Sequence, residues 1–140
     1  MRTLTRAEPR KLTIVVPGPE AATLQRLARR GLSGASTLAG RLLSRALRAY
    51  EHPAIELTPA PDGTCVARLA GRRVAVWVLA ERARKLNPAE QAKELHIPEP
   101  LIQAALDYAA AYPEDIAEDA VLGQRSLAEC GLQESTPPKK

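Results

Sequence analysis

The side chains best placed to act together chemically are the carboxylates of the run Glu114-Asp115-Ile116-Ala117-Glu118-Asp119. Such a cluster can hold a divalent cation, but a solvated acidic helix face is the simpler interpretation. A catalytic site needs a convergent set of nucleophile and base, paired carboxylates or metal ligands. The chain has no glycine-rich phosphate loop, no His-x-x-His and no Cys-x-x-Cys motif. We therefore expect a protein that is not an enzyme and that holds no metal and no cofactor.

The charges are divided unevenly along the chain. Residues 1–53 carry ten Lys and Arg against three Asp and Glu, whereas residues 87–140 carry four against ten. This asymmetry predicts that the basic part meets a polyanion and that the acidic part meets a different partner. Two solvated faces would give the same pattern, so charge alone leaves both interpretations open.

The bulk composition predicts a small cytoplasmic protein of one domain or two very small ones. No apolar run approaches the roughly 20 residues of a membrane span, and no signal-peptide pattern opens the chain. Cys65 and Cys130 are far apart and follow no metal spacing, so reduced thiols are expected. The chain has no Phe and only 3% aromatic residues, so its core must consist of Ala, Leu, Val and Ile.

A short strand is predicted at Lys11–Val16. Apolar residues occupy every second position from Leu12 onward, which is the pattern of a half-buried strand, and Pro17 ends it. The backbone groups of a lone strand need a partner strand, and the same strand of a second copy would supply it. We therefore expect a homodimer or a higher oligomer whose two-stranded ribbon fits a DNA major groove.

Helical spacing and helix-breaking residues predict the other elements. A first helix follows Pro17-Gly18 and ends at Gly31, and a second begins at Ser36 as its N-cap and runs to about Tyr50. Further elements are expected after Pro53, with Asn87 capping the helix that starts at Pro88. They are strands at Ile55–Leu57, Cys65–Leu69 and Arg73–Val76, a turn at Pro61-Asp62-Gly63, and helices at about Val78–Leu86, Pro88–Leu95, Glu99–Tyr112 and Glu114–Leu122.

Residues 10–50 resemble the ribbon-helix-helix family of prokaryotic repressors and antitoxins. In that family the outward side chains of the paired strands enter the major groove, which assigns base contacts to Lys11, Thr13 and Val15. Family members usually have a polar residue at the position of Val15. The resemblance also places a backbone phosphate at the start of the second helix, near Ser36 and Thr37. The alternative is a dimerisation strand without a DNA role, and the positive charge of this part argues against it.

Three stretches, in family order, resemble a small prokaryotic domain of unknown function found in VapB-like antitoxins. They are His52-Pro53-Ala54-Ile55, Ala70-Gly71-Arg72-Arg73-Val74-Ala75-Val76-Trp77 and Leu86-Asn87-Pro88-Ala89-Glu90-Gln91-Ala92. The chain departs from the family with Ala54 for a glycine, Ala75 for a proline and Asn87 for a serine. The resemblance implies a compact helical domain with a helix-turn-helix-like core and a small β-hairpin. It also implies a PIN-like nuclease toxin encoded beside it.

The helix at Glu99–Tyr112 contains no Lys or Arg, so we do not expect it to read DNA. Its apolar and acidic surface suits a protein partner better. The candidate partner-binding residues are Arg73, Tyr108, Tyr112 and Asp115. Arg73 has two open interpretations, because it could face a partner or pair with an acid inside its own domain.

The sequence therefore predicts a mainly α protein with short β strands. The expected parts are an N-terminal arm (1–9), a ribbon-helix-helix dimerisation and DNA-binding domain (10–51), a helix-turn-helix-like domain (52–122) and a disordered tail (123–140). The expected function is a cytoplasmic antitoxin that binds its own promoter as a dimer and neutralises a PIN-like ribonuclease toxin. The alternative is an adaptor or structural oligomerisation protein that does not bind DNA.

Overall fold

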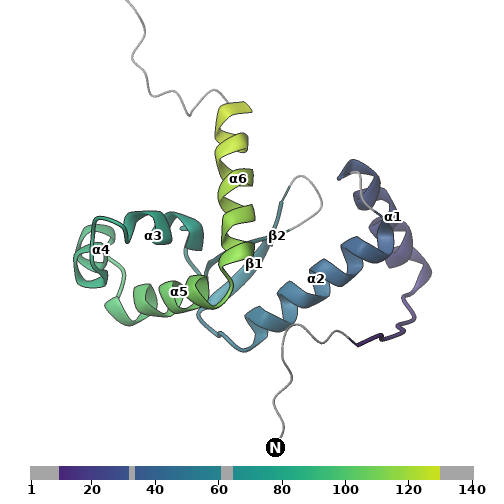
Figure 1. The fold of residues 1–140 in the computed structure, drawn as a ribbon, viewed down its shortest axis with the longest axis horizontal. Helices are drawn as coiled ribbons and strands as arrows, with labels where there is room; N and C mark the ends of the chain where they lie inside the picture. The colour runs from purple at the N-terminus through teal and green to yellow at the C-terminus, as the bar shows by residue number, and fades with distance from the viewer. Residues whose placement is uncertain (1–9, 32–33, 61–64, 130–140) are drawn as a thin grey trace, which may run out of the picture.

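The computed structural model describes residues 10–31, 34–60 and 65–129, except for the side chains of residues 126–129. Within these ranges the chain forms mainly helices and one two-stranded antiparallel sheet, which confirms the mainly α class with short β. Figure 1 shows α1 and α2 on one side of the sheet and α3, α4 and α5 on the other. The elements are α1 (Gly18–Arg30), α2 (Ala35–Tyr50), β1 (Ile55–Pro59), β2 (Cys65–Leu69), α3 (Val76–Arg82), α4 (Pro88–Leu95), α5 (Glu99–Ala111) and α6 (Pro113–Glu129).

The first two helices form close to where the sequence predicts them. Pro19 lies in the first turn of α1, where its missing N–H is not needed. The predicted cap of α2 at Ser36 is wrong, because α2 begins at Ala35 and its N-cap is Gly34. Ser36 lies inside the first turn, so its side chain is past the position from which it could cap the helix.

The strands β1 and β2 pair in antiparallel register, with Ile55 opposite Leu69. Gly71 follows with a φ of 72°, a left-handed conformation that glycine adopts without strain. The predicted strand at Arg73–Val76 is wrong, because this stretch makes only an isolated bridge between Ala75 and Arg68 before α3 begins. The predicted turn at Pro61-Asp62-Gly63 lies outside the described residues.

The start of α4 confirms the cap predicted at Asn87. The Asn87 side chain accepts a hydrogen bond from the Glu90 N–H at 2.8 Å, and the Glu90 carboxylate accepts one from the Asn87 N–H at 2.8 Å. This reciprocal arrangement is a capping box, and Pro88 occupies the first helical turn. The helix begins here because the local side chains satisfy its free N–H groups.

The last helix is longer than its sequence pattern indicates. A disordered tail was expected from Gly123, but α6 continues through this residue to Glu129. Gly123 lies against the indole of Trp77, and a Cβ at this position would be 2.6 Å from the ring. The glycine that appeared to end the helix therefore permits its close packing on α3. The remainder of the predicted tail, residues 130–140, lies outside the described residues.

The hydrophobic core lies between the sheet and helices α3, α5 and α6. Its buried members are Ile55, Ala67, Leu69, Val76, Leu79, Ile97, Ile102, Ala105, Tyr108 and Ile116. Among the described residues, α1 and α2 bury only Ala28, Leu38 and Arg45. The first two helices are therefore much less covered than the rest of the chain. No helix of the described part is long and apolar enough to cross a membrane.

Candidate functional site

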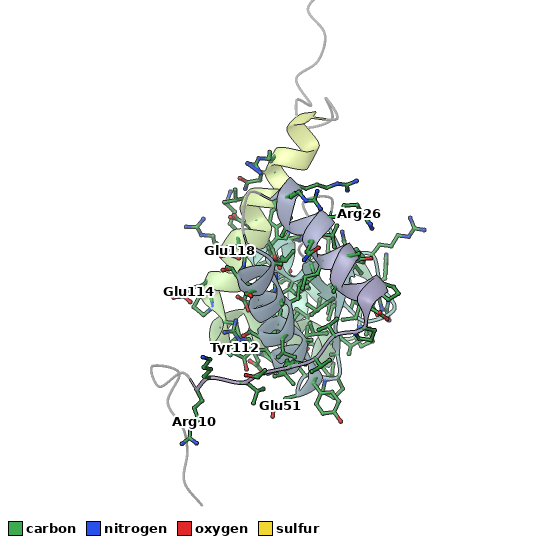
Figure 2. All side chains as sticks on the ribbon, turned by 90° about the vertical axis from the view of Figure 1, so that its right-hand side faces the viewer. Arg10, Arg26, Glu51, Tyr112, Glu114 and Glu118 are labelled. Carbon is green, nitrogen blue, oxygen red and sulfur yellow. The ribbon has the colours of Figure 1, made fainter. Side chains whose placement is uncertain are left out.

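The segment Arg10–Pro17 forms no helix or strand in the single chain. No strand of the described residues pairs with it, so its predicted pairing with a second copy stays a prediction. Its apolar side chains are not covered, since Leu12 is 75% and Val15 92% exposed. Figure 2 shows Arg10 at the outer end of this segment, pointing away from the helices.

The residues predicted to contact DNA are all exposed. Lys11, Thr13 and Val15 lie on this segment, whereas Ser36 and Thr37 lie in the first turn of α2. The N-cap residue of α2 is Gly34, which has no side chain to accept a hydrogen bond from the N–H groups of this turn. The structure thus leaves these residues accessible, and their contact with DNA stays a prediction.

Helix α2 has two opposite faces with different surroundings. Leu43, Leu47 and Tyr50 recur at helical spacing and are 38%, 58% and 85% exposed. The face that carries the arginines is turned toward the sheet and α6, and Arg45 is buried. Leu43, Leu47 and Tyr50 therefore lie at the surface, while the face with Leu38 and Arg45 lies against the rest of the chain.

The arginines of α2 pair with the acids of α6. Arg45 donates two hydrogen bonds to the carboxylate of Asp119, at 2.7 and 2.9 Å, across 74 residues of sequence. Arg48 pairs with Asp115 at 2.7 Å, and the exposed pair of Arg41 and Glu118 lies at 2.6 Å. Figure 2 shows Glu114 and Glu118 along the side of α2. We call these three ion pairs the α2–α6 ladder.

The central pair of the ladder, Arg45 and Asp119, also makes hydrogen bonds with backbone groups. Arg45 donates to the Cys65 carbonyl oxygen at 2.7 Å, and Asp119 accepts from the Ala67 N–H at 3.1 Å. Burial alone would lower the pKa of Arg45, but the hydrogen bond and charge of Asp119 outweigh burial and raise this pKa. The guanidinium therefore stays charged and fixes α2 and α6 to β2 together.

An aromatic cluster closes the end of the ladder where α2 ends and α6 begins. The rings of His52, Tyr108 and Tyr112 meet edge to face at centroid distances between 5.1 and 5.8 Å. The Arg48 guanidinium lies over the Tyr112 ring at 5.3 Å from its centroid. Burial raises the pKa of the Tyr108 hydroxyl.

The structure does not bring the four predicted partner-binding residues together. Tyr108 has no exposed surface, and Asp115 is buried in its ion pair with Arg48, so neither can bind a partner in this structure. Tyr112 packs in the aromatic cluster. Of the four, only Arg73 is in the exposed class, and it lies at a cavity beside β2 and α3 instead. The assignments of Tyr108 and Asp115 are wrong, because helical spacing alone does not tell which acidic and aromatic side chains other elements cover, and those of Tyr112 and Arg73 stay predictions.

The ladder also changes the interpretation of the charge asymmetry. The basic and acidic parts were expected to meet separate partners, yet three arginines of one pair with three acids of the other. Positions 41, 45 and 48 share one face of α2, and positions 115, 118 and 119 share one face of α6. Opposite charges on two helical faces were the sequence signal that could have identified this contact.

The acidic run at Glu114–Asp119 is explained by this pairing. Its carboxylates at positions 115, 118 and 119 face arginines. Within the part of the chain that the structure describes, no group of three or more His, Cys, Asp or Glu is placed to hold a metal ion. The run therefore acts as an internal counter-charge for α2.

Comparisons were made with protein-family models, with curated proteins and with solved structures. No family model matches this chain, and neither a curated protein nor a solved structure matches it.

Proposed function

We propose that this chain is a dimeric, DNA-binding antitoxin of the cytoplasm that represses its own promoter and neutralises a PIN-like ribonuclease. The observation that carries the DNA-binding part is the uncovered apolar surface of the N-terminal region. The segment Lys11–Val16 and the outer face of α2 both expose large apolar side chains. A ribbon-helix-helix dimer explains why the chain keeps both exposed.

A second copy would cover both surfaces at once. Pairing of the two Lys11–Val16 segments would satisfy their backbone groups and turn Leu12 and Ile14 toward the helices. Leu43 and Leu47 would pack against their counterparts. Full burial of each large apolar side chain contributes about 1.5–3 kcal/mol, so burial of several from each chain would favour dimerisation.

The basic residues available to DNA are fewer than the sequence count suggests. The three arginines of the α2–α6 ladder already have carboxylate partners. Among the described residues, the remaining cations of this region lie on the exposed segment and on α1, and Figure 2 shows Arg26 on the outward side of α1. Beside the base contact assigned to Lys11, the phosphate-binding set among these residues is Arg10, Arg26, Arg29 and Arg30, with the start of α2 as a neutral contact.

The dimer can be tested with matched substitutions. Leu47→Glu places a charge on the proposed interface, whereas Val121→Glu does the same at a similarly exposed position of α6. Light scattering after size exclusion should give a dimer for the native chain and for Val121→Glu, and a monomer for Leu47→Glu. A native chain that is monomeric at micromolar concentration, or a dimeric Leu47→Glu, would contradict the proposal.

The ribbon can be tested in gel-shift assays with the promoter fragment. Replacing both Lys11 and Thr13 with Ala should abolish specific binding and leave the dimer intact. Lys93→Ala removes an exposed cation from α4 and should leave affinity unchanged. Affinity for DNA should fall steeply with salt, because phosphate contacts release counterions. Unchanged operator affinity in the Lys11 and Thr13 variant would exclude the ribbon as the reading element.

The toxin-binding part rests on the signature between His52 and Ala92. Helices α3, α4 and α5 follow one another and pack together, which suits the helix-turn-helix-like core that the resemblance implies. We assign this part to protein binding because α5 contains no Lys or Arg. Co-expression with the neighbouring gene should yield a complex in which ribonuclease activity is suppressed. If neither DNA nor a nuclease binds, the chain is an adaptor instead.

A further inference from the structure

A cavity of about 720 Å³ lies beside the sheet, on the side formed by α3, the end of α4 and α6. Its volume is within the range of about 300–1,000 Å³ that is typical of small-molecule sites. Most of its wall is apolar. The main apolar side chains of the wall are Val66, Val74, Trp77, Val78, Ile97 and Leu122.

Among the residues that the structure describes, Arg68, Arg72 and Arg73 are the charged residues that line this cavity, and none of the lining residues is acidic. Arg68 is held in place, since it donates to the Thr58 hydroxyl at 3.0 Å and to the Arg73 carbonyl oxygen at 3.1 Å. Arg72 and Arg73 are exposed, and neither forms an ion pair with a described residue. Elsewhere in the described chain, arginines such as Arg45 and Arg48 have carboxylate partners. The cavity therefore concentrates positive charge beside an apolar wall.

The wall is formed by packed elements. The Trp77 ring is held against α6 at Gly123, the only residue type that permits this approach. Val66 and Ile97 are buried in the adjoining core. The cavity is thus bordered by β2, α3 and α6, which the α2–α6 ladder and the core hold together.

We propose that this cavity binds a small organic anion with an apolar body and one carboxylate or phosphate group. The apolar body would lie against Trp77, Val74 and Leu122, and the anionic group would accept hydrogen bonds from Arg72 and Arg73. Guanidinium groups suit both anions because they donate in a planar fork. This site is separate from the DNA-binding and dimer surfaces, so it does not depend on the proposed function.

The single tryptophan of the chain lines the cavity, which makes its fluorescence a direct probe of binding. The full-length protein is titrated with decanoate, decyl phosphate, decanol and decyltrimethylammonium, all below micelle-forming concentrations. The two anions should change the Trp77 emission saturably and bind about tenfold or more tightly than decanol, as expected for a charge-assisted hydrogen bond. The cation should bind more weakly than decanol.

Two arginine variants distinguish recognition of the anionic group from nonspecific binding of the apolar chain. Replacing both Arg72 and Arg73 with Ala should weaken decanoate binding about tenfold or more and leave decanol binding unchanged. Arg84→Ala removes an exposed arginine that does not line the cavity and should leave both affinities unchanged. Circular dichroism confirms that each variant is folded.

Several results would overturn the proposal. One is no saturable response to either anion, and another is equal affinity for anion, alcohol and cation. A third is decanoate binding that is unaffected by loss of Arg72 and Arg73. Binding of a synthetic peptide of alternating leucine and glutamate, with no response to decanoate or decyl phosphate, would identify a docking groove for an acidic protein segment instead.

Discussion

The buried ion pair of Arg45 and Asp119 should couple the two ends of the chain energetically. Both side chains are at least nine-tenths buried, and they are joined by two short hydrogen bonds. Replacing Arg45 with Met would leave the Asp119 carboxylate buried, with the Ala67 N–H as its remaining hydrogen-bond donor among the described residues. Replacing Asp119 with Leu would leave the Arg45 guanidinium with the Cys65 carbonyl and the more distant Asp115.

Each single substitution should lower the free energy of unfolding by about 3–5 kcal/mol, because it leaves one uncompensated buried charge. The double variant removes both charges and orphans two backbone groups, the Cys65 carbonyl and the Ala67 N–H. Each orphaned group costs about 1–3 kcal/mol, partly offset by new apolar burial. The double variant should therefore be no less stable than either single variant, with a coupling energy of at least about 3 kcal/mol.

Urea denaturation followed by far-UV circular dichroism gives the free energy of unfolding of the native chain, the two single variants and the double variant. These four values form a double-mutant cycle. Arg41 and Glu118 supply a matched control on the same two helices, since this pair is about half exposed. A parallel cycle with Arg41→Met and Glu118→Leu should give a coupling energy of no more than about 1 kcal/mol. Equal coupling in the two cycles would refute the buried contact between α2 and α6.

Three further predictions follow from local features. Burial raises the pKa of Cys65 and of Tyr108 above their ordinary values of 9.0 and 10.0, so the folded state holds both protons more tightly. The urea midpoint should therefore fall as pH rises through and above these values. The fall should be less steep in Cys65→Ala. A midpoint that does not change with pH would contradict this prediction. Gly123→Ala should destabilise the fold by about 1–3 kcal/mol and shift the Trp77 emission. Gly→Ala usually stabilises a helix, and such a stabilisation here would show that α6 does not pack on Trp77. Asn87→Ala should cost about 1 kcal/mol through loss of the capping box, measured by the same denaturation, and no loss would exclude the cap.

Signals contained within a few residues were sufficient to predict much of this fold. The α4 helix was predicted with its observed bounds because Asn87 and Pro88 mark its start by local chemistry. The β2 strand was predicted as Cys65–Leu69, and α1 was bounded by its proline and glycine. Helix capping, helix breaking and the alternation of apolar and polar residues in strands depend on residues that are neighbours in the sequence. These features can therefore be predicted from a single sequence.

Signals at the ends of helices were less reliable where packing decided the outcome. The disordered tail was predicted to begin at Gly123, but the lack of a side chain at this residue serves the contact between α6 and Trp77. The local sequence does not show whether a glycine near the end of a helical pattern packs against another element. The predicted strand at Arg73–Val76 was similarly replaced by the start of α3, whose Val76 is buried in the core.

The sequence by itself determined that α2 is amphipathic, with an apolar stripe on one face and arginines on another. Only the tertiary structure decided that the arginine face packs on α6 with Arg45 buried, because Asp115, Glu118 and Asp119 of α6 pair with its arginines. Periodicity defines the faces of a helix, but the free energy of burying a face depends on what lies opposite. For Arg45 that partner is 74 residues away, so its burial is a property of the fold and not of its local sequence.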